Sequence, residues 1–582
     1  MSDVSTAVTG SPADVSTVEG EGFVSFEGER LYRIADVDRM PPFLMALISG
    51  GDQWMYVSSR GGLTAGRVGP DFCIFPYETD DKLHRVHRYT GPATAIRYRR
   101  GGGDDLRGLW RPFAGEPDDP ARYALYKNAT GSRIVFEAVN EALGLTLRYR
   151  WAAAGAMGLV RTVTLDRHDA ADPLDVEVID GVRNVLPAGA ILLLQQRQSC
   201  LINSYTRAEI EPASGLAAVS VTSQIIDRAE PAESLTANVA WAIGPDAAEV
   251  GPSRRVTLDP AAFDAFCAGG LDAMPDAAVL TGRRPDYLVG FAATLQAGRT
   301  LRWRTGVDAE RSQAKVVELA EQLREPAAMD QAIDAALAEA RADLHRLLAD
   351  ADAFAATGDE LATAHHTADV LFNIMRGGVF VDDGRCDAAD FRAFVRSMNR
   401  PLAEYHAAML DGLPETLEHE RLLVEIDAAG DPQLSRLGRE YLPLTFSRRH
   451  GDPSRPWNIF AIHVRDEQGR PVFNYQGNWR DIFQNWQALC HSFPSYLPSV
   501  VARFVNASTM DGYNPYRVTR QGIDWEVPDP DDPWAGFGYW GDHQVVYLMH
   551  LLEAWRQFAP GAAAAWLDRR WFTYAAVPYR IK

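Results

Sequence analysis

The chain has 582 residues and a formal net charge of −20 at pH 7. Its hydrophobic fraction of 46% and charged fraction of 23% are typical of a globular enzyme with two or three domains. The acidic balance argues against nucleic acid or an anionic membrane surface as a partner. No apolar run approaches the about 20 residues that a membrane-spanning helix needs.

The first residues lack the basic start and apolar core of a signal peptide. We therefore expect residues 1–21 to form a disordered tail and the protein to be cytoplasmic. The five cysteines are scattered and never form a C-x-x-C pair, which argues against a disulfide framework or a zinc site. We expect no metal and no cofactor.

Residues 22–307 are predicted to be mostly β-strand. Short alternating or β-branched runs recur there between Gly, Pro, Asp and Asn. The predicted strands are Phe23–Phe26, Gln53–Ser58, Ala95–Tyr98, Arg133–Ala138, Leu145–Trp151, Gly158–Leu165, Leu174–Ile179, Ile191–Leu194, Ala217–Thr222 and Thr300–Thr305. So many strands in one region indicate a large antiparallel β-supersandwich built from two packed sheets.

From residue 308 onward, the apolar residues recur at the spacing of an α-helix. Residues 308–355 are predicted to be a helical linker, and residues 356–582 a mainly helical domain. Its candidate helices are 359–376, 388–411, 414–428, 433–441, 481–505, 542–558 and 561–574, with one β-hairpin that pairs Ile459–Val464 with Pro471–Tyr475.

Two helix starts in this domain carry polar and aromatic side chains suited to a sugar. The first is Trp479-Arg480-Asp481, and the second is Tyr539-Trp540-Gly541-Asp542-His543. Carboxylates accept hydrogen bonds from hydroxyl groups, Arg donates a rigid fork, and Trp stacks on the apolar face of a pyranose. The alternative is that both aspartates are helix caps and the tryptophans are core residues.

Two polar loops are further candidates. Asp524-Trp525-Glu526 places two carboxyl groups beside an indole, and inverting glycoside chemistry needs a protonated carboxyl at the leaving oxygen. A solvated acidic loop is the alternative for this segment. The basic loop Arg448-Arg449-His450, with Asp452 and Arg455, suits either phosphate or sugar hydroxyls, or is a solvated loop.

The segment from Trp479 to Asn485, read as WRDIFQN, resembles the Arg-Asp-x-x-Gln-Asp helix start of cellobiose-phosphorylase-type inverting glycoside phosphorylases. Cyclic β-1,2-glucan synthases carry a similar C-terminal module. The resemblance implies an (α/α)6 barrel after the β-supersandwich. It also implies that Arg480 and Asp481 contact the sugar ring next to the cleaved bond. The other expected substrate-binding residues are Trp479, Gln484, Trp525, Tyr539, Trp540, Asp542 and His543.

The sequence departs from that family in one respect. No Asp-Trp-Asn-Asp motif, which carries the family's general acid, follows Asp542. Asp524 and Glu526 are the remaining candidates for the acid, although they lie upstream of the expected position. About seven predicted helices are too few to close a twelve-helix ring, so the barrel is expected to be incomplete and the chain truncated.

The resulting function is phosphorolysis of β-glucosides or oligosaccharides, with inorganic phosphate as co-substrate. The alternatives are an inverting glycoside hydrolase and a non-catalytic carbohydrate-binding fragment. An open half-ring leaves apolar faces uncovered, which predicts a homodimer or a partner that supplies a missing C-terminal half.

Overall fold

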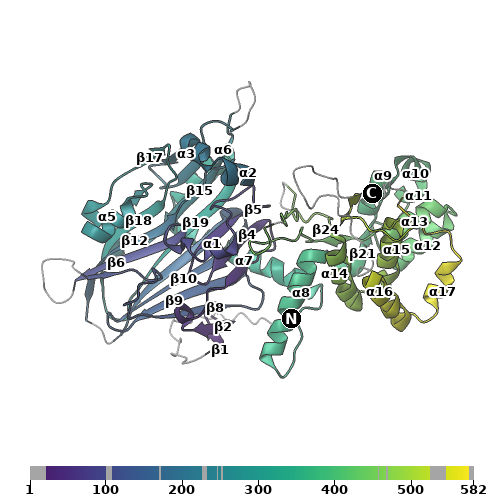
Figure 1. Ribbon diagram of the computed structural model, residues 1–582, viewed down its shortest axis with the longest axis horizontal. Helices are drawn as coiled ribbons and strands as arrows, with labels where there is room; N and C mark the ends of the chain where they lie inside the picture. The colour runs from purple at the N-terminus through teal and green to yellow at the C-terminus, as the bar shows by residue number, and fades with distance from the viewer. Residues whose placement is uncertain are drawn as a thin grey trace, which may run out of the picture. The chain divides into compact units, whose positions relative to one another are not determined.

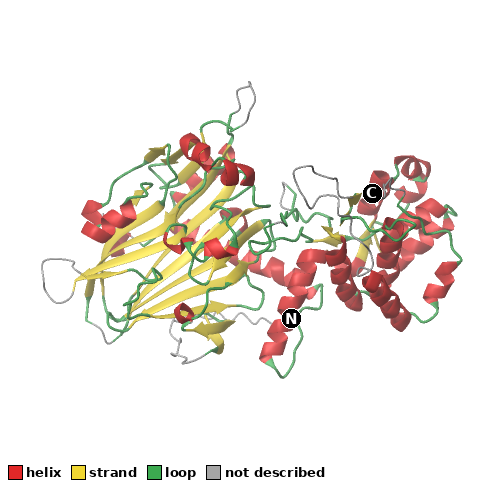
Figure 2. Cartoon of the chain, viewed as in Figure 1, coloured by secondary structure: helices red, strands yellow, loops and turns green. Residues whose placement is uncertain are grey.

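The computed structural model describes residues 21–99, 108–169, 172–225, 233–245, 247–250, 253–456, 458–466, 470–524 and 545–575. The chain forms two compact units. The first consists of Met1–Ile48, Gln53–Gly66 and Asp71–Leu337, and the second of Ser49–Asp52, Arg67–Pro70 and Ala338–Lys582. Figure 2 shows that strands dominate the first unit and helices the second.

The first unit contains an eleven-stranded sheet in the order β1-β2-β8-β9-β10-β11-β19-β15-β14-β13-β17 and a five-stranded sheet in the order β16-β18-β12-β6-β7. The strands of the larger sheet are Gly22–Phe26, Glu29–Ala35, Arg122–Lys127, Arg133–Asn140, Leu145–Ala153, Leu159–Arg167, Thr300–Ser312, Thr236–Ile243, Ala217–Val221, Thr206–Ile210 and Val279–Thr281. Those of the smaller sheet are Arg255–Thr257, Tyr287–Leu295, Leu174–Arg183, Gly91–Arg99 and Gly108–Trp110. A third sheet joins β3 (Leu44–Leu47), β4 (Gln53–Ser58) and β5 (Leu63–Arg67).

The two large sheets pack face to face (Figure 1). Alternate residues such as Leu147 and Val163 from one sheet and Val178 and Phe291 from the other form a single core. The outer face of the larger sheet is covered by α6 (Gln313–Leu323) and α7 (Pro326–Ala349), and that of the smaller sheet by α5 (Ala262–Gly269). The predicted large antiparallel sheet structure is therefore present.

Two expectations for this region need correction. The run Ile191–Leu194 does not form a strand, because α2 occupies Leu192–Arg197. A short apolar run has no period that separates the two structures. Strand β19 continues to Ser312, so the expected boundary at 307 falls inside it, and the helices of 308–355 are shared between the two units.

The second unit is mainly helical. Its helices are α8 (Glu360–Gly377), α9 (Ala388–Met398), α10 (Arg400–Tyr405), α11 (Ala407–Asp411), α12 (His419–Ala428), α13 (Pro432–Glu440), α14 (Trp479–Ser492), α15 (Leu497–Ala507), α16 (Val545–Phe558) and α17 (Ala562–Leu567). Among the described residues, the hairpin expected between Ile459–Val464 and Pro471–Tyr475 keeps one isolated bridge, Arg465 with Pro471, while Ala461 bridges to Arg449 instead. No helix in the described part of the chain is both long and apolar enough to cross a membrane.

One segment of the second unit is inserted between two paired strands. β20 (Val379–Phe380) pairs with β23 (Leu444–Thr445), so the chain leaves and returns at the same place. Between them, α9 to α13 bury a core of their own that includes Phe391, Leu422 and Tyr441. The helices expected at 388–441 therefore exist, but they pack around each other as a separate subdomain.

Candidate functional site

The start of α14 is held by a small sheet. β24 (Gln476–Asn478) runs directly into the helix and pairs with β25 (Arg517–Thr519), which pairs with β26 (Gly522–Asp524). Asp481 lies in the first turn and is half-buried. The free backbone N–H groups of a helix start and the positive end of its dipole favour negative charge there.

A close helix crossing brings the end of α8 to the same place. A Cβ atom added at Gly377 would lie 2.9 Å from the Cβ of Asn485 and 3.2 Å from Cδ1 of Trp486. The indole of Trp486 donates a hydrogen bond of 2.8 Å to the carbonyl of Gly377. Only glycine permits this approach, which places Arg376, in the last turn of α8, beside the loop described next.

The loop after β23 contributes an imidazole between charged groups. His450 is half-buried, and its pKa is lowered by burial and then by the positive charge of Arg376, while the negative charges of Asp481 and Asp452 oppose this shift. Nη1 of Arg455 lies 3.3 Å from Nε2 of His450. Since a guanidinium only donates, Nε2 accepts this hydrogen bond and the ring is neutral.

Arg376 is notable because its guanidinium has no hydrogen-bond or ion-pair partner among the described residues. His450, Asp481 and Arg376 come from three separate stretches of sequence, so helical periodicity in any one of them does not reveal the group. The predicted basic loop pointed to His450 and Arg455, whereas Arg376 was missed. The guanidinium of Arg376 can donate hydrogen bonds to an anion, and the carboxylate of Asp481 can accept hydrogen bonds from hydroxyl groups.

The predicted acid Asp524 lies near this helix start. The register of the small sheet places Asn478, Arg517 and Asp524 in one row across three strands, so Asn478 and Asp524 are about 10 Å apart at the Cα level. Nε of Arg517 donates a hydrogen bond of 2.8 Å to the Asp524 carboxylate. Arg503 of α15 secures the hairpin by donating to the carbonyl of Thr519 at 2.8 Å.

Helices α14 and α16 run parallel. Contacts between them advance in the same direction along both helices: Gln484 with Tyr547, Gln487 with His550, and His491 with Phe558. Tyr547 donates a hydrogen bond of 3.3 Å to Oε1 of the exposed Gln484. The described start of α16 thus lies beside the first turns of α14, at the end of that helix where Asp481 is found.

Trp479 is not available to stack on a sugar. Its side chain is 1% exposed, and its ring packs 4.6 Å from that of Phe483 and 4.7 Å from that of Phe504. The expectation that it binds substrate is therefore wrong, and it is a core residue. Of the remaining predicted site residues, the Arg480 side chain and Trp525, Glu526, Tyr539, Trp540, Asp542 and His543 lie outside the described part of the structure.

Comparisons with known proteins add a family match. Residues 380–443 match the family model described as glycoside hydrolase family 149 insertion domain 1. These are nearly the residues that lie between β20 and β23 and share a separate core. The match relates this segment to an insertion domain of a glycoside hydrolase family. No curated protein matches the sequence.

Several solved structures show a distant likeness to this chain. A putative kojibiose phosphorylase from the human microbiome is 6% identical with a TM-score of 0.35, over 95% of this chain and 67% of that one. A bacterial glucoamylase complexed with acarbose is 8% identical with a TM-score of 0.29, over 82% of this chain and 61% of that one. A family GH92 inverting mannosidase from Bacteroides thetaiotaomicron is 10% identical with a TM-score of 0.28, over 88% of this chain and 69% of that one. This chain thus spans about 61% of the length of the glucoamylase, and none of these likenesses transfers a residue role.

Proposed function

We propose that the protein is a carbohydrate-active enzyme that phosphorolyses β-glucosides or oligosaccharides, with its site at the start of α14. The observation that carries the class is the match of residues 380–443 to an insertion domain of glycoside hydrolase family 149. The match agrees with the topology, because the same segment is bracketed by β20 and β23. The sequence resemblance to cellobiose-phosphorylase-type enzymes at Trp479–Asn485 supports the same class.

The charges around Asp481 favour phosphate over water as the nucleophile. Arg376, Arg455 and Asp481 all act on the charge of His450, so two guanidinium groups lie in the neighbourhood of this carboxylate, and Arg376 has no partner among the described residues. A hydrolase needs a second carboxylate to activate water, whereas a phosphorylase needs cationic groups that hold phosphate. In the proposed reaction, Asp481 and Arg480 bind hydroxyl groups of the sugar in the subsite next to the cleaved bond.

The proposed step is a single inverting displacement. A phosphate oxygen forms the new bond to the anomeric carbon while the glycosidic C–O bond breaks, and a carboxylic acid protonates the leaving oxygen. Asp524 and Glu526 remain the proposed sources of that proton. For Asp524, this role requires that its carboxyl group be released from Arg517. The helices that flank the site are proposed to form part of an (α/α)6-type barrel.

The test is product analysis on the purified chain. β-linked glucosyl disaccharides are incubated with and without inorganic phosphate, and sugar 1-phosphate and free reducing sugar are quantified separately. We expect sugar 1-phosphate only when phosphate is present, and we expect Arg376→Gln to raise the KM for phosphate. Arg385→Gln, at an exposed arginine of the inserted subdomain, is the matched control.

If turnover is the same with and without phosphate, the proposal is wrong and the protein is instead a glycoside hydrolase. Binding of oligosaccharide with no turnover under either condition would favour the non-catalytic carbohydrate-binding protein.

A further inference from the structure

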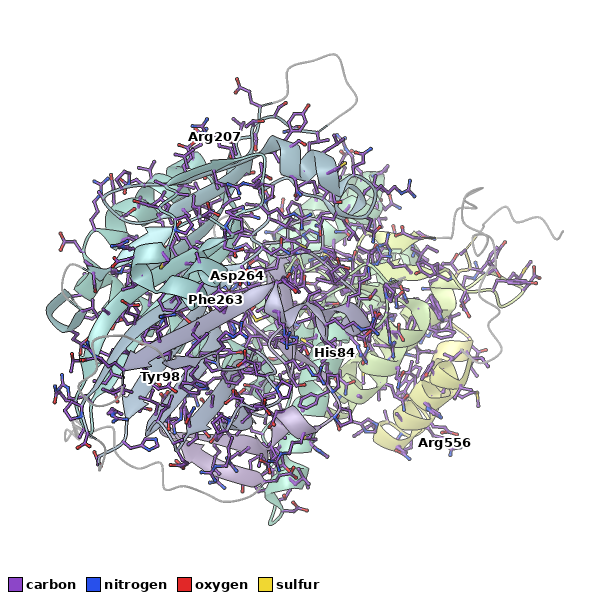
Figure 3. The ribbon with its side chains drawn as sticks, turned by 60° about the vertical axis from the view of Figure 1, so that its left-hand side comes forward. His84, Tyr98, Arg207, Phe263, Asp264 and Arg556 are labelled. Atoms are coloured by element: carbon purple, nitrogen blue, oxygen red, sulfur yellow. The ribbon has the colours of Figure 1, made fainter. Side chains whose placement is uncertain are left out.

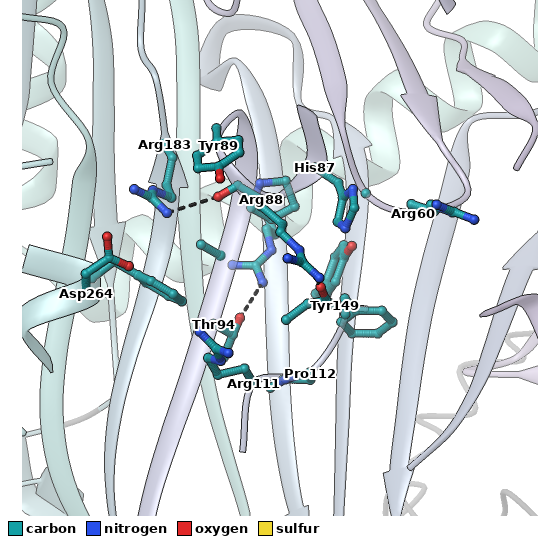
Figure 4. A pocket seen from close by; sticks show the side chains of 17 residues that line it. Arg60, His87, Arg88, Tyr89, Thr94, Arg111, Pro112, Tyr149, Arg183 and Asp264 are labelled. Carbon is teal, nitrogen blue, oxygen red and sulfur yellow. Dashed lines mark hydrogen bonds between the residues drawn. The ribbon is translucent and has the colours of Figure 1, made fainter. Parts of the chain in front are cut away.

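A cavity of about 230 Å³ lies in the first unit, apart from the helical domain. Its walls come from both large sheets: Tyr149 of β10 and Arg161 of β11 from the larger one, and Thr94 of β6 from the smaller one. Further wall residues are Arg60, Gly61, His87, Arg88, Tyr89, Arg111, Arg183, Phe263 and Asp264 (Figure 4). The proposed enzymatic site uses none of them.

The floor of the cavity is a buried polar network between the sheets. Nη1 of Arg161 donates to both carboxylate oxygens of Asp180, at 2.8 and 2.7 Å. Thr94 donates to the same carboxylate at 2.5 Å, and the Arg161 guanidinium lies 4.4 Å from the centre of the Tyr149 ring. This network fixes the orientation of the Tyr149 ring beneath the cavity.

The cavity carries more positive than negative charge. Arg161, Arg183 and Arg111 are paired with Asp180, Asp286 and Glu116 respectively. Within the described residues, the Arg88 guanidinium donates only to the main-chain carbonyls of Ala114, at 2.9 Å, and Gly115, at 3.2 Å, and carbonyls do not cancel its charge. The Arg60 guanidinium, at the exposed mouth, has no partner among the described residues. Two guanidinium charges are therefore left for a ligand.

An unused hydroxyl group also faces the cavity. Tyr149 is 2% exposed, and its hydroxyl has no hydrogen-bond partner in the described part of the chain. A Cβ atom added at Gly61 would lie 3.3 Å from this hydroxyl, so the glycine keeps the space above it open. The hydroxyl opens onto the cavity, so it is available to form a hydrogen bond to a ligand there.

The opposite side of the cavity has a different character. Phe263 and Asp264 lie next to each other on α5 (Figure 3), and Asp264 faces the cavity from the side away from Arg60 and His87 (Figure 4). The Asp264 carboxylate has no described partner. The carboxylate suits the hydroxyl groups of a sugar ring, whereas the Phe263 ring is 8% exposed and lies 5.2 Å from the Arg183 guanidinium.

We propose that this cavity binds a monosaccharide-sized ligand that carries an oxyanion, as in a sugar phosphate or a uronate. The oxyanion accepts hydrogen bonds from Arg88 and Tyr149, with Arg60 attracting it at the mouth. Asp264 accepts hydrogen bonds from the hydroxyl groups at the other end. The volume accommodates one sugar ring.

The test is isothermal titration calorimetry on the full chain with glucose 1-phosphate, glucuronate, inorganic phosphate and glucose as separate probes. We expect glucose 1-phosphate or glucuronate to bind more tightly than glucose. Arg88→Gln and Tyr149→Phe should each weaken binding, by about tenfold for the charged contact. Asp264→Asn should weaken the binding of glucose 1-phosphate or glucuronate but leave that of inorganic phosphate unchanged.

Two controls separate this site from other effects. Arg207→Gln removes an exposed arginine of the same unit and should change nothing (Figure 3). Glucose 1-phosphate is also the product expected at the second-unit site, so each titration is repeated in Arg376→Gln, where the phosphate position of that site is disabled. Binding that remains in this variant, and that Arg88→Gln then weakens, belongs to the cavity. Tyr149→Phe keeps the buried ring, and the exposed Arg60 offers a further substitution, Arg60→Gln, that does not disturb the core.

The proposal is overturned if glucose binds as tightly as the charged probes. It is also overturned if folded Arg88→Gln and Tyr149→Phe bind them like the unchanged protein, or if no charged probe binds. Weaker binding to glucuronate than to glucose 1-phosphate identifies the phosphate ester as the ligand class, and the reverse order identifies the uronate.

Discussion

Replacing Arg503 by methionine tests the buried network that supports the candidate site. Arg503 is 3% exposed, and its Nη1 lies 3.1 Å from Oε2 of Glu440, which is equally buried. Breaking a buried ion pair costs about 3–5 kcal/mol because one charge stays buried without its partner. Arg436 still pairs with Glu440 at 2.7 Å, so we expect the lower end of this range.

Urea unfolding followed by tryptophan fluorescence and circular dichroism measures this loss. A loss of about 3 kcal/mol lowers the urea midpoint of the second unit by about 1–1.5 M, for slopes of about 2–3 kcal/mol per molar. Arg421→Met is the matched control, because Arg421 pairs with Glu425 on the exposed face of α12, where such pairs contribute about 0–1 kcal/mol. The reasoning is refuted if the two variants lose the same stability.

Two further predictions concern the second unit. Burial, and then the charge of Arg439, lowers the pKa of His419 from 6.5 to about 3. Between about pH 6.5 and pH 3, this histidine is protonated in the unfolded chain but stays neutral in the folded chain. The free energy of unfolding therefore falls by about 1.4 kcal/mol for each pH unit in that range. His419→Gln should flatten the pH dependence of the urea midpoint, and exposed His365→Gln should not. Gly377→Ala should lower the melting temperature through a loss of about 1–3 kcal/mol, since its methyl group meets Asn485. Gly358→Ala, where a Cβ meets no atom within 4 Å, is its control.

Periodicity predicted part of the elements of the fold. The alternating runs from Phe23 to Thr305 became strands, except Ile191–Leu194, but strands such as β8, β15 and β18 were not predicted. Helices formed in the helical runs after residue 359, although the run 388–411 divides into three helices and the run 561–574 keeps only Ala562–Leu567. Their grouping was not predictable, because nothing local in Phe391 or Leu422 says that α9 to α13 share a separate core. That information lies in the pairing of β20 with β23, across more than sixty residues of chain.

The candidate site was predicted in part. The pattern Trp479-Arg480-Asp481 located the helix start, but a tryptophan beside polar residues reads the same whether its ring faces a ligand or the core. The structure places the Trp479 ring against Phe504. Arg376 carries no local signal, since its role depends on the close crossing at Gly377. Such contacts between distant segments are what a single sequence conceals.

The uncovered apolar surface expected from an incomplete ring stays a prediction about partners. α16 exposes large apolar side chains, at Val545, Val546, Met549 and Phe558. Light scattering across a range of concentrations measures whether the chain associates with itself. If the chain forms a homodimer, the mean molecular mass should rise with protein concentration. The mass of a monomer at all concentrations would contradict that expectation.

The most direct test of the account is the affinity of the purified chain for a β-linked glucosyl disaccharide, measured by calorimetry before and after Asp481→Asn. Asp511→Asn, at an exposed loop position of the same unit, is the control. We predict that Asp481→Asn weakens binding by about tenfold or more, because a carboxylate that accepts hydroxyl hydrogen bonds is lost, while the control binds unchanged. Equal affinity in all three proteins would contradict a sugar site at the start of α14.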